Sequence, residues 1–349
     1  MPRAEAAAPR LPALRLLSRP ASQRSGRSLK PAHAPGAPAT LIAFIFPGQG
    51  SQKVGMGRAL ADEFLVCRKT FDEADAALGE ALSRLCFEGP EHRLRLTENT
   101  QPAILATSVA AYRLLSSLGL EPSFVAGHSL GEYSAHVAAG TMSFGAALQL
   151  VRRRGRYMQE AVPLGEGAMA AILGLDAGDV ARACEQAADG QVVGPANLNG
   201  PGQVVIAGAR YAVRRAGDRA KALGAKRVIP LQVSAPFHCA LMKPAEDRLA
   251  PELRGLELCN PRVPVIANVD AEPKRDVRAC IDALVRQVSL PVQWESVVRR
   301  LASEGVSAYV EVGPGSVLTG LVRKIHREAA TASIEAPAGL DAVKALFGR

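Results

Sequence analysis

The sequence predicts an α/β protein whose main domain is interrupted by a small inserted subdomain. Helical and strand patterns alternate along residues 41–164 and 235–349, which is typical of a sheet with helices packed on its faces. Residues 165–234 instead follow the order strand, helix, strand, strand, helix, strand, which is the ferredoxin-like pattern. At 349 residues the chain is long enough for a discontinuous main domain and this insertion.

Residues 1–40 are excluded from this fold, and we expect them to be a disordered leader or extension. They contain seven basic residues and one acid, a net charge of +6 out of +9 for the whole chain. The basic balance of the protein is therefore poor evidence for nucleic-acid binding, which we do not expect. The Arg-, Ala-, Pro- and Ser-rich composition is typical of an organelle transit peptide, and an over-long start assignment is the alternative.

Cysteine usage and hydropathy indicate a soluble protein of a reducing compartment. The six cysteines are scattered without a C-x-x-C pair, which argues against a zinc site or a disulfide framework. No apolar run approaches the roughly 18–20 residues that a membrane-spanning helix needs.

The first predicted strand, Leu41–Phe46, enters the sequence Pro-Gly-Gln-Gly-Ser-Gln at 47–52. This loop matches neither a P-loop nor a complete dinucleotide-binding motif. A tight turn that presents backbone N–H groups to an oxyanion is the other use of such a loop. Helices are predicted next, over Asp62–Leu78 and over Asn99–Leu118.

A Gly-x-Ser-x-Gly motif at 127–131 has the flanks of a nucleophile elbow. Phe124–Ala126 reads as the end of a buried strand, and Leu130–Ala139 as a helix that stops at Gly140. Such a turn exposes the central serine and directs helix N–H groups at what the serine attacks. Ser129 is therefore a candidate nucleophile, and an ordinary serine in a glycine-rich turn is the alternative.

The helix predicted over Phe144–Met158 has an apolar stripe on which Arg154 falls. A guanidinium that faces the interior is costly without a partner. Arg154 is therefore one half of an internal salt bridge, a side chain that snorkels to the surface, or a receptor for a substrate carboxylate. Its neighbours Arg152, Arg153 and Arg156 fall off the stripe, on the face expected to be solvated.

The remaining elements complete both predicted units. Within the insertion we predict strands at 168–173, 192–198, 203–207 and 226–233 and helices at 176–188 and 211–223. After it, a strand lies within 260–268, a helix begins at 291–294, and a strand covers 307–312.

A serine nucleophile needs a general base, and His238 is the best candidate among six histidines. It lies in a proline-containing loop where the chain re-enters the main domain. The alternative is a capping or packed histidine. His128 adjoins the serine but neighbours on a tight turn usually point apart, and His136 reads as packing.

Together these motifs resemble the malonyl-CoA:acyl-carrier-protein transacylase family and, more distantly, the acyltransferase domains of polyketide synthases. The matching stretches occur in the order of the family and cover nearly everything after residue 41. They are FPGQGSQ (46–52), NTQPA (99–103), GHSLGEYSA (127–135), RGRYMQEAVP (154–163), NLNGPGQVVIAG (197–208), FHCALMKP (237–244), PVQW (291–294) and EVGPGSVLTG (311–320).

The resemblance implies an α/β-hydrolase-like main domain with the ferredoxin-like insertion, and it implies roles for the site residues. Ser129 is the expected nucleophile and His238 its base, oriented by the main-chain carbonyl of Gln293. The backbone N–H groups of Gln49 and Leu130 are the expected oxyanion hole. Arg154 is expected to bind the malonyl carboxylate, with Gln101 nearby.

The implied reaction is the ping-pong transfer of malonyl from malonyl-CoA, through a malonyl-serine, to the phosphopantetheine thiol of acyl carrier protein. It supplies extender units for fatty acid biosynthesis, with polyketide synthesis as the alternative, and involves no metal or other cofactor. We expect a free-standing, monomeric, cytoplasmic enzyme of bacterial type, or a mitochondrial or plastid one if residues 1–40 are a transit peptide.

Two other functions stay open on the sequence. In a serine esterase or thioesterase, water would replace the carrier thiol. In a non-catalytic module, the same fold would only bind a carrier protein.

Overall fold

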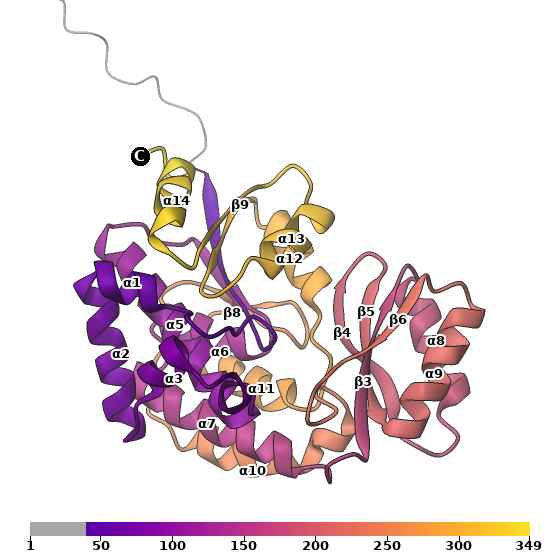
Figure 1. The fold of residues 1–349 in the computed structure, drawn as a ribbon. Helices are drawn as coiled ribbons and strands as arrows, with labels where there is room; N and C mark the ends of the chain where they lie inside the picture. The colour runs from indigo at the N-terminus through magenta and orange to yellow at the C-terminus, as the bar shows by residue number, and fades with distance from the viewer. Residues whose placement is uncertain (1–39) are drawn as a thin grey trace, which may run out of the picture. The chain divides into compact units, whose positions relative to one another are not determined.

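The computed structural model describes residues 40–349, which form one compact unit. The leader predicted over residues 1–40 lies, apart from Thr40, outside the described residues. The described unit is a mixed α/β fold with two sheets (Figure 1).

The larger sheet has six strands in the order β10-β9-β1-β2-β7-β8. The strands are β1 (Leu41–Phe46), β2 (Phe124–Gly127), β7 (Val265–Ile266), β8 (Pro273–Lys274), β9 (Val306–Val312) and β10 (Ala330–Ile334). All neighbours pair in parallel except β7 and β8. Because β1 is central and its residues alternate between two faces, Phe44 and Phe46 join one hydrophobic core while Ala43 and Ile45 join another.

Helices cover both faces of this sheet. They are α1 (Arg58–Glu63), α2 (Leu65–Leu78), α3 (Leu82–Glu88), α4 (Glu91–Leu94), α5 (Thr97–Ser117), α6 (Leu130–Ala138), α7 (Phe144–Glu160), α10 (Lys243–Arg254), α11 (Val277–Gln287), α12 (Trp294–Ser303), α13 (Val317–Ile325) and α14 (Leu340–Leu346), with short 3₁₀ turns at Ala240–Met242 and Pro337–Gly339. Helices α5, α6 and α7 contribute to the core that holds Phe44. Helices α12 and α13 contribute Trp294 and Leu318 to the core on the opposite face.

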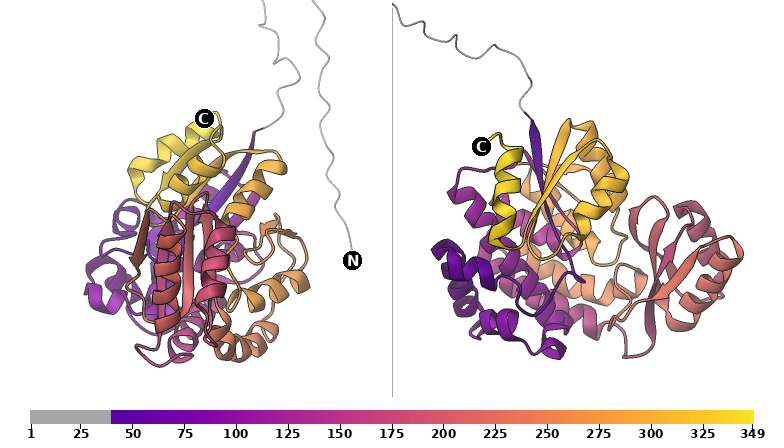
Figure 2. Two further views of the ribbon diagram at one scale, coloured as in Figure 1. Left: turned by 90° about the vertical axis from the view of Figure 1, so that its right-hand side faces the viewer. Right: turned by 45° about the horizontal axis from the view of Figure 1, so that its top comes forward.

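The smaller sheet is formed by the predicted insertion. Its strands β3 (Gly167–Leu173), β4 (Val193–Gly200), β5 (Gln203–Ala209) and β6 (Arg227–Pro230) are antiparallel in the order β4-β5-β3-β6. Helices α8 (Ala177–Ala187) and α9 (Arg210–Ala222) pack on the face turned away from the larger sheet and enclose a third core (Figures 1 and 2). On the other side, an isolated bridge joins Asn197 of β4 to Val292, so β4 is bonded to the segment that precedes α12.

The element order agrees with the sequence prediction, with local differences. The helix predicted over Asp62–Leu78 is two helices, because Phe64 adopts an extended conformation (φ −117°, ψ 120°) between α1 and α2. The strand predicted within 260–268 is reduced to Val265–Ile266, and the strand predicted over 226–233 ends at Pro230. In these two segments the apolar pattern continues where the backbone has left the sheet.

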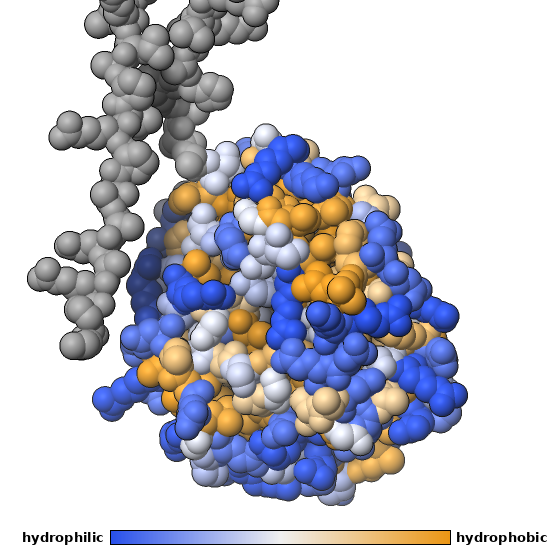
Figure 3. Space-filling view, turned by 90° about the vertical axis from the view of Figure 1, so that its left-hand side faces the viewer, coloured by the Kyte–Doolittle hydropathy of each residue, from blue (hydrophilic) through white to orange (hydrophobic). Residues whose placement is uncertain are grey.

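On the face formed by α1 and α2, small hydrophobic patches are separated by hydrophilic residues (Figure 3). Within residues 40–349, no helix combines the length and the apolar character needed to cross a bilayer.

Candidate active site

Ser129 lies at a sharp turn between β2 and α6, at the carboxyl end of a central strand. Its backbone angles are φ 52° and ψ −105°, a region that residues with a side chain rarely occupy. The glycines on either side permit the turn. A Cβ at Gly127 would lie 2.0 Å from the carbonyl oxygen of Gly131, and one at Gly131 would lie 2.0 Å from that of Phe46. The motif therefore forms the elbow geometry predicted for it.

His238 faces the serine across the turn. Its Nε2 lies 2.7 Å from Ser129 Oγ, and its Nδ1 lies 2.9 Å from the backbone carbonyl oxygen of Gln287. Because a carbonyl only accepts hydrogen bonds, Nδ1 carries the proton and Nε2 is free to accept the serine proton. The geometry is that of a nucleophile and its general base.

The carbonyl that orients His238 belongs to Gln287, so the assignment of Gln293 was wrong. Gln293 is the N-cap residue of α12, and its backbone N–H donates to the carbonyl oxygen of Asn268 at 2.9 Å. Gln287 is the last residue of α11, where the final carbonyl groups of a helix have no partner within the helix. One of these unpaired carbonyls is therefore available to the imidazole.

Two effects keep His238 neutral. Burial lowers its pKa to about 3, and the nearby Arg154 charge lowers it in the same direction. The imidazole is therefore unprotonated at neutral pH, which is the state that a general base requires.

Two backbone N–H groups lie where an oxyanion hole is expected. Within residues 40–349, neither the N–H of Gln49 nor that of Leu130 donates to a protein acceptor. Leu130 is the first residue of α6, so its N–H belongs to the positive end of the helix dipole. Gln49 lines the same cavity as Ser129.

Arg154 lies beside the nucleophile and is 1% exposed. Its Nη1 donates to Gln101 Oε1 at 2.8 Å, and its Nη2 donates to Gln287 Oε1 at 2.9 Å and to Ser129 Oγ at 3.2 Å. Within the described part of the chain Arg154 belongs to no ion pair, although its charge is buried beside a ligand cavity. The internal salt bridge that the sequence left open is therefore absent from residues 40–349.

The arginines that flank Arg154 have other environments. Arg152 forms an ion pair with Glu80 and Arg153 forms one with Glu252, whereas Arg156 is exposed. Two of the three side chains expected to be solvated therefore connect α7 to neighbouring elements.

The side chains of His128 and His136 make no hydrogen bond to Ser129 or His238, although His128 lines the same cavity. His128 Nε2 lies 2.8 Å from Asn199 Oδ1 of β4, so its ring points toward the smaller sheet. His136 is fully buried on α6, and neither ring nitrogen has a hydrogen-bond partner.

Three polar residues that the sequence analysis did not assign surround the elbow. Asn268 Oδ1 accepts from the N–H of Ser129 at 2.7 Å, and Asn268 Nδ2 donates to the carbonyl oxygen of Gly127 at 2.7 Å. Gln287 Nε2 donates to the carbonyl oxygen of Ser129 at 2.8 Å and to Glu132 Oε2 at 2.9 Å. Glu132 lies within the quoted motif 127–135, whereas nothing in the sequence marked Asn268 or Gln287.

A cavity of about 100 Å³ opens above Ser129 between the two sheets. Its lining includes Gln101, Met158, Asn197, Phe237 and His238. A groove of about 670 Å³ shares Gln49, Leu231 and Val233 with it and extends the site outward. The cavity therefore suits a short acyl group, with space for a longer carrier along the groove.

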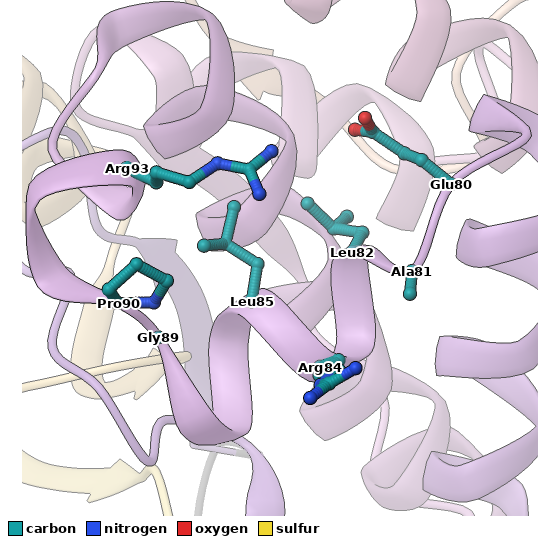
Figure 4. Close-up of a pocket in the computed structure, with 8 residues that line it drawn as sticks. All are labelled: Glu80, Ala81, Leu82, Arg84, Leu85, Gly89, Pro90 and Arg93. Atoms are coloured by element: carbon teal, nitrogen blue, oxygen red, sulfur yellow. The ribbon is translucent and has the colours of Figure 1, made fainter.

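A separate hollow of about 440 Å³ lies among α2, α3 and α4 (Figure 4). It is lined by Glu80, Ala81, Leu82, Arg84, Leu85, Gly89, Pro90 and Arg93. None of these residues belongs to the site around Ser129.

Comparison with known proteins agrees with this geometry. Residues 43–341 match the model of the acyl transferase domain family. The chain is 53% identical over 304 residues to the malonyl CoA-acyl carrier protein transacylase of Escherichia coli strain K12, an alignment that covers 87% of this chain and 98% of that protein. It is 47% identical over 301 residues to the transacylase of the same name from Bacillus subtilis strain 168, covering 86% and 95% respectively.

The similar solved structures are also named as malonyl transferases. An acyl carrier protein S-malonyltransferase from Vibrio cholerae superposes with a TM-score of 0.85 at 51% identity, covering 86% of this chain and 99% of that one. A malonyl-transacylase solved in complex with a type II polyketide synthase acyl carrier protein superposes with a TM-score of 0.86 at 50% identity, covering 89% and 100%. The chain therefore belongs to the malonyl CoA-acyl carrier protein transacylase family of acyl transferase domains.

Proposed function

We propose that this protein transfers malonyl from malonyl-CoA to the phosphopantetheine thiol of acyl carrier protein through a malonyl-Ser129 intermediate. The observation that carries the proposal is Arg154, a buried cation with no carboxylate within 4 Å in residues 40–349, whose Nη2 lies 3.2 Å from Ser129 Oγ. Malonyl has one methylene between its thioester carbonyl and its carboxylate. A malonyl group that reacts with Ser129 can therefore place its carboxylate on this guanidinium, where paired hydrogen bonds would neutralise the charge.

In the first half-reaction, His238 Nε2 takes the proton of Ser129 as Oγ bonds to the thioester carbonyl carbon. The negative charge that develops on the carbonyl oxygen is stabilised by the N–H groups of Gln49 and Leu130. The carbon–sulfur bond then breaks, the CoA sulfur takes the proton from His238, and CoA leaves as the thiol, so His238 is neutral again.

In the second half-reaction, the carrier thiol gives its proton to His238, and its sulfur bonds to the carbonyl carbon of malonyl-Ser129. The bond to Oγ breaks, and Ser129 recovers the proton from His238. Each step moves one acyl group and one proton, so the chemistry requires neither a metal nor a redox cofactor. The small cavity around Ser129 favours malonyl over longer dicarboxylic acyl groups.

We also propose the finer description of the fold. The larger sheet and the elbow between β2 and α6 support an α/β-hydrolase-like main domain over 41–164 and 235–349. The element order and the strand order β4-β5-β3-β6 support a ferredoxin-like subdomain over 165–234. The breaks between α7 and β3 and after β6 support these boundaries. The bacterial relatives support a cytoplasmic enzyme of fatty acid or polyketide extender supply.

Intact-mass spectrometry after mixing the full chain with malonyl-CoA tests the function. We expect a mass increase of one malonyl group, its absence in Ser129→Ala, and its loss when acyl carrier protein with its phosphopantetheine arm is added. Release of malonate without the carrier would indicate a hydrolase, and the absence of any adduct would indicate a binding module.

A further inference from the structure

The side chain of Gln287 connects the carboxylate-binding arginine to the elbow, while its backbone connects to the base. The residue is fully buried. Its amide oxygen accepts from Arg154 at 2.9 Å, and its amide nitrogen donates to the carbonyl oxygen of Ser129 at 2.8 Å. Its own carbonyl accepts from His238 at 2.9 Å. A shift of this residue would therefore displace Arg154 and His238 together.

The amide has one orientation that satisfies its neighbours. A guanidinium only donates, so the amide oxygen must face Arg154. The nitrogen must then face two acceptors, which are the carbonyl oxygen of Ser129 and Glu132 Oε2 at 2.9 Å. If the Gln287 amide were flipped and Glu132 were ionised, the amide oxygen would face two acceptors, the Ser129 carbonyl and Glu132 Oε2. The amide nitrogen would face Arg154, which only donates.

Glu132 also binds Asn268, the second residue that contacts the elbow. Its Oε2 accepts from the backbone N–H of Asn268 at 3.0 Å, and the side chain of Asn268 binds the N–H of Ser129 and the carbonyl of Gly127. Glu132 is fully buried, and no ion pair in residues 40–349 includes it. A buried carboxylate without a paired cation is costly to stability, so its contribution lies in the groups that it orients.

We propose that Glu132 is a positioning residue that, through the amide of Gln287, fixes Arg154 and His238 relative to Ser129. The inference rests on the proposed malonyl transfer. It assigns to Glu132 a combined effect on malonyl selectivity and on the base, although Glu132 touches neither the substrate carboxylate nor the reacting atoms.

The test compares kcat/KM for malonyl-CoA and acetyl-CoA in variants of the full chain. Glu132→Met keeps the side-chain length and removes the acceptor oxygen. We expect the malonyl preference to fall by on the order of tenfold, with a lower kcat as well, because contacting polar residues couple at this level. Glu132→Gln keeps one oxygen that can accept from Gln287 and Asn268, so it should restore most of the preference.

The matched control is Glu311, another fully buried carboxylate, which accepts from the N–H groups of Leu318 and Thr319 at the start of α13. Glu311→Gln should lower the melting temperature and leave the ratio of malonyl to acetyl rates unchanged. A Glu132→Met protein that behaves like this control would show that Glu132 is structural only and overturn the inference.

A double-mutant cycle with Gln287→Met tests the route of the effect. Gln287→Met alone should lower the malonyl preference, and adding Glu132→Met should then change it little. An unchanged preference in Gln287→Met would overturn the inference even if Glu132→Met fails to fold. Where all the variants fold, fully additive losses would overturn it as well. Failure of the wild-type chain to form malonyl-Ser129 would instead overturn the proposed function.

Discussion

Arg154 donates its hydrogen bonds only to neutral oxygens, those of Gln101, Gln287 and Ser129. Malonyl would supply the missing negative charge, whereas acetyl would leave the guanidinium unpaired. We expect Arg154→Ala to lose malonyl transfer by several orders of magnitude while keeping or gaining acetyl transfer. Without Arg154 the malonyl carboxylate would be buried unpaired, and removing one partner of a buried pair costs about 3–5 kcal/mol, which corresponds to that loss.

Arg154→Lys is the informative companion, because a lysine cannot form the parallel pair of hydrogen bonds and should recover little. The measurement is kcat/KM for malonyl-CoA and acetyl-CoA in each folded variant. Equal losses for the two thioesters would show that Arg154 supports the fold rather than selects the substrate.

The burial of His136 leads us to expect that stability depends on pH, independently of catalysis. Burial lowers its pKa to about 3, and neither ring nitrogen has a partner. A folded-state pKa below the unfolded value gives stability that is present above about pH 6.5 and is lost as the pH falls. The change in the free energy of unfolding caused by His136→Leu should therefore be more favourable at pH 5 than at pH 7, by about 2 kcal/mol.

Urea unfolding of both proteins at the two pH values measures this difference. His92 is exposed, so His92→Gln is the matched control, and its effect on the free energy of unfolding should be the same at the two pH values. A pH-independent effect of His136→Leu would mean that the fold does not lower the pKa of His136.

Helix α7 places Arg154 through a close approach to α5 at the next residue, Gly155. A Cβ there would lie 2.7 Å from the carbonyl oxygen of Thr97 and 2.8 Å from the Cα of Glu98. Backbone atoms cannot yield as a flexible side chain can, so Gly155→Ala should separate the helices, at a cost of about 1–3 kcal/mol. Because Arg154 moves with α7, malonyl transfer should fall with stability.

Gly145 of the same helix is the control, since a Cβ there meets only Ala77 Cβ, at 3.8 Å. Gly145→Ala should be neutral or gain about 0.5 kcal/mol from helix propensity. Thermal melting and kcat/KM of both variants check the comparison. A Gly155→Ala protein as stable and active as Gly145→Ala would contradict the close-approach argument.

The elements were predictable where a periodic pattern agreed with the local turn residues. Strand β1 and helices α6 and α7 lie where the sequence placed them, within two residues. The break at Phe64 was not predictable, because an apolar residue at helical spacing does not reveal an extended backbone. Similarly, the apolar run around Val265 does not show how many of its residues pair with β2.

The site was predictable only in its side chains of recognisable chemistry. Ser129, His238 and Arg154 were found from motif, loop position and helical face. The group that orients His238 is a backbone carbonyl, which every residue possesses, so the sequence pointed to Gln293 where the fold provides Gln287. Likewise, Asn268 becomes part of the elbow only because β7 pairs with β2.

The whole described unit contributes to the site, since the cavity is lined by helices α5 and α7, by the elbow and by strands β3 and β4. His128 contacts Asn199 of the smaller sheet, and β4 is bonded to Val292, which precedes α12. The smaller sheet therefore contributes Met169 and Asn197 to the cavity lining and is bonded to the segment that precedes α12. All the proposed catalytic and binding residues lie within 40–349.

A protein that begins at Thr40 should consequently fold and transfer malonyl at the rate of the full chain. A protein that begins at Pro47 should not fold, because it lacks β1, which pairs with both β2 and β9. Ile42, Phe44, Ile45 and Phe46 are nearly or fully buried, and each contributes about 1.5–3 kcal/mol. Their sum is comparable to the whole stability of a typical domain, about 5–15 kcal/mol. Circular dichroism and malonyl transfer on both proteins provide the measurement, and loss of folding in the protein that begins at Thr40 would show that the first 39 residues are required.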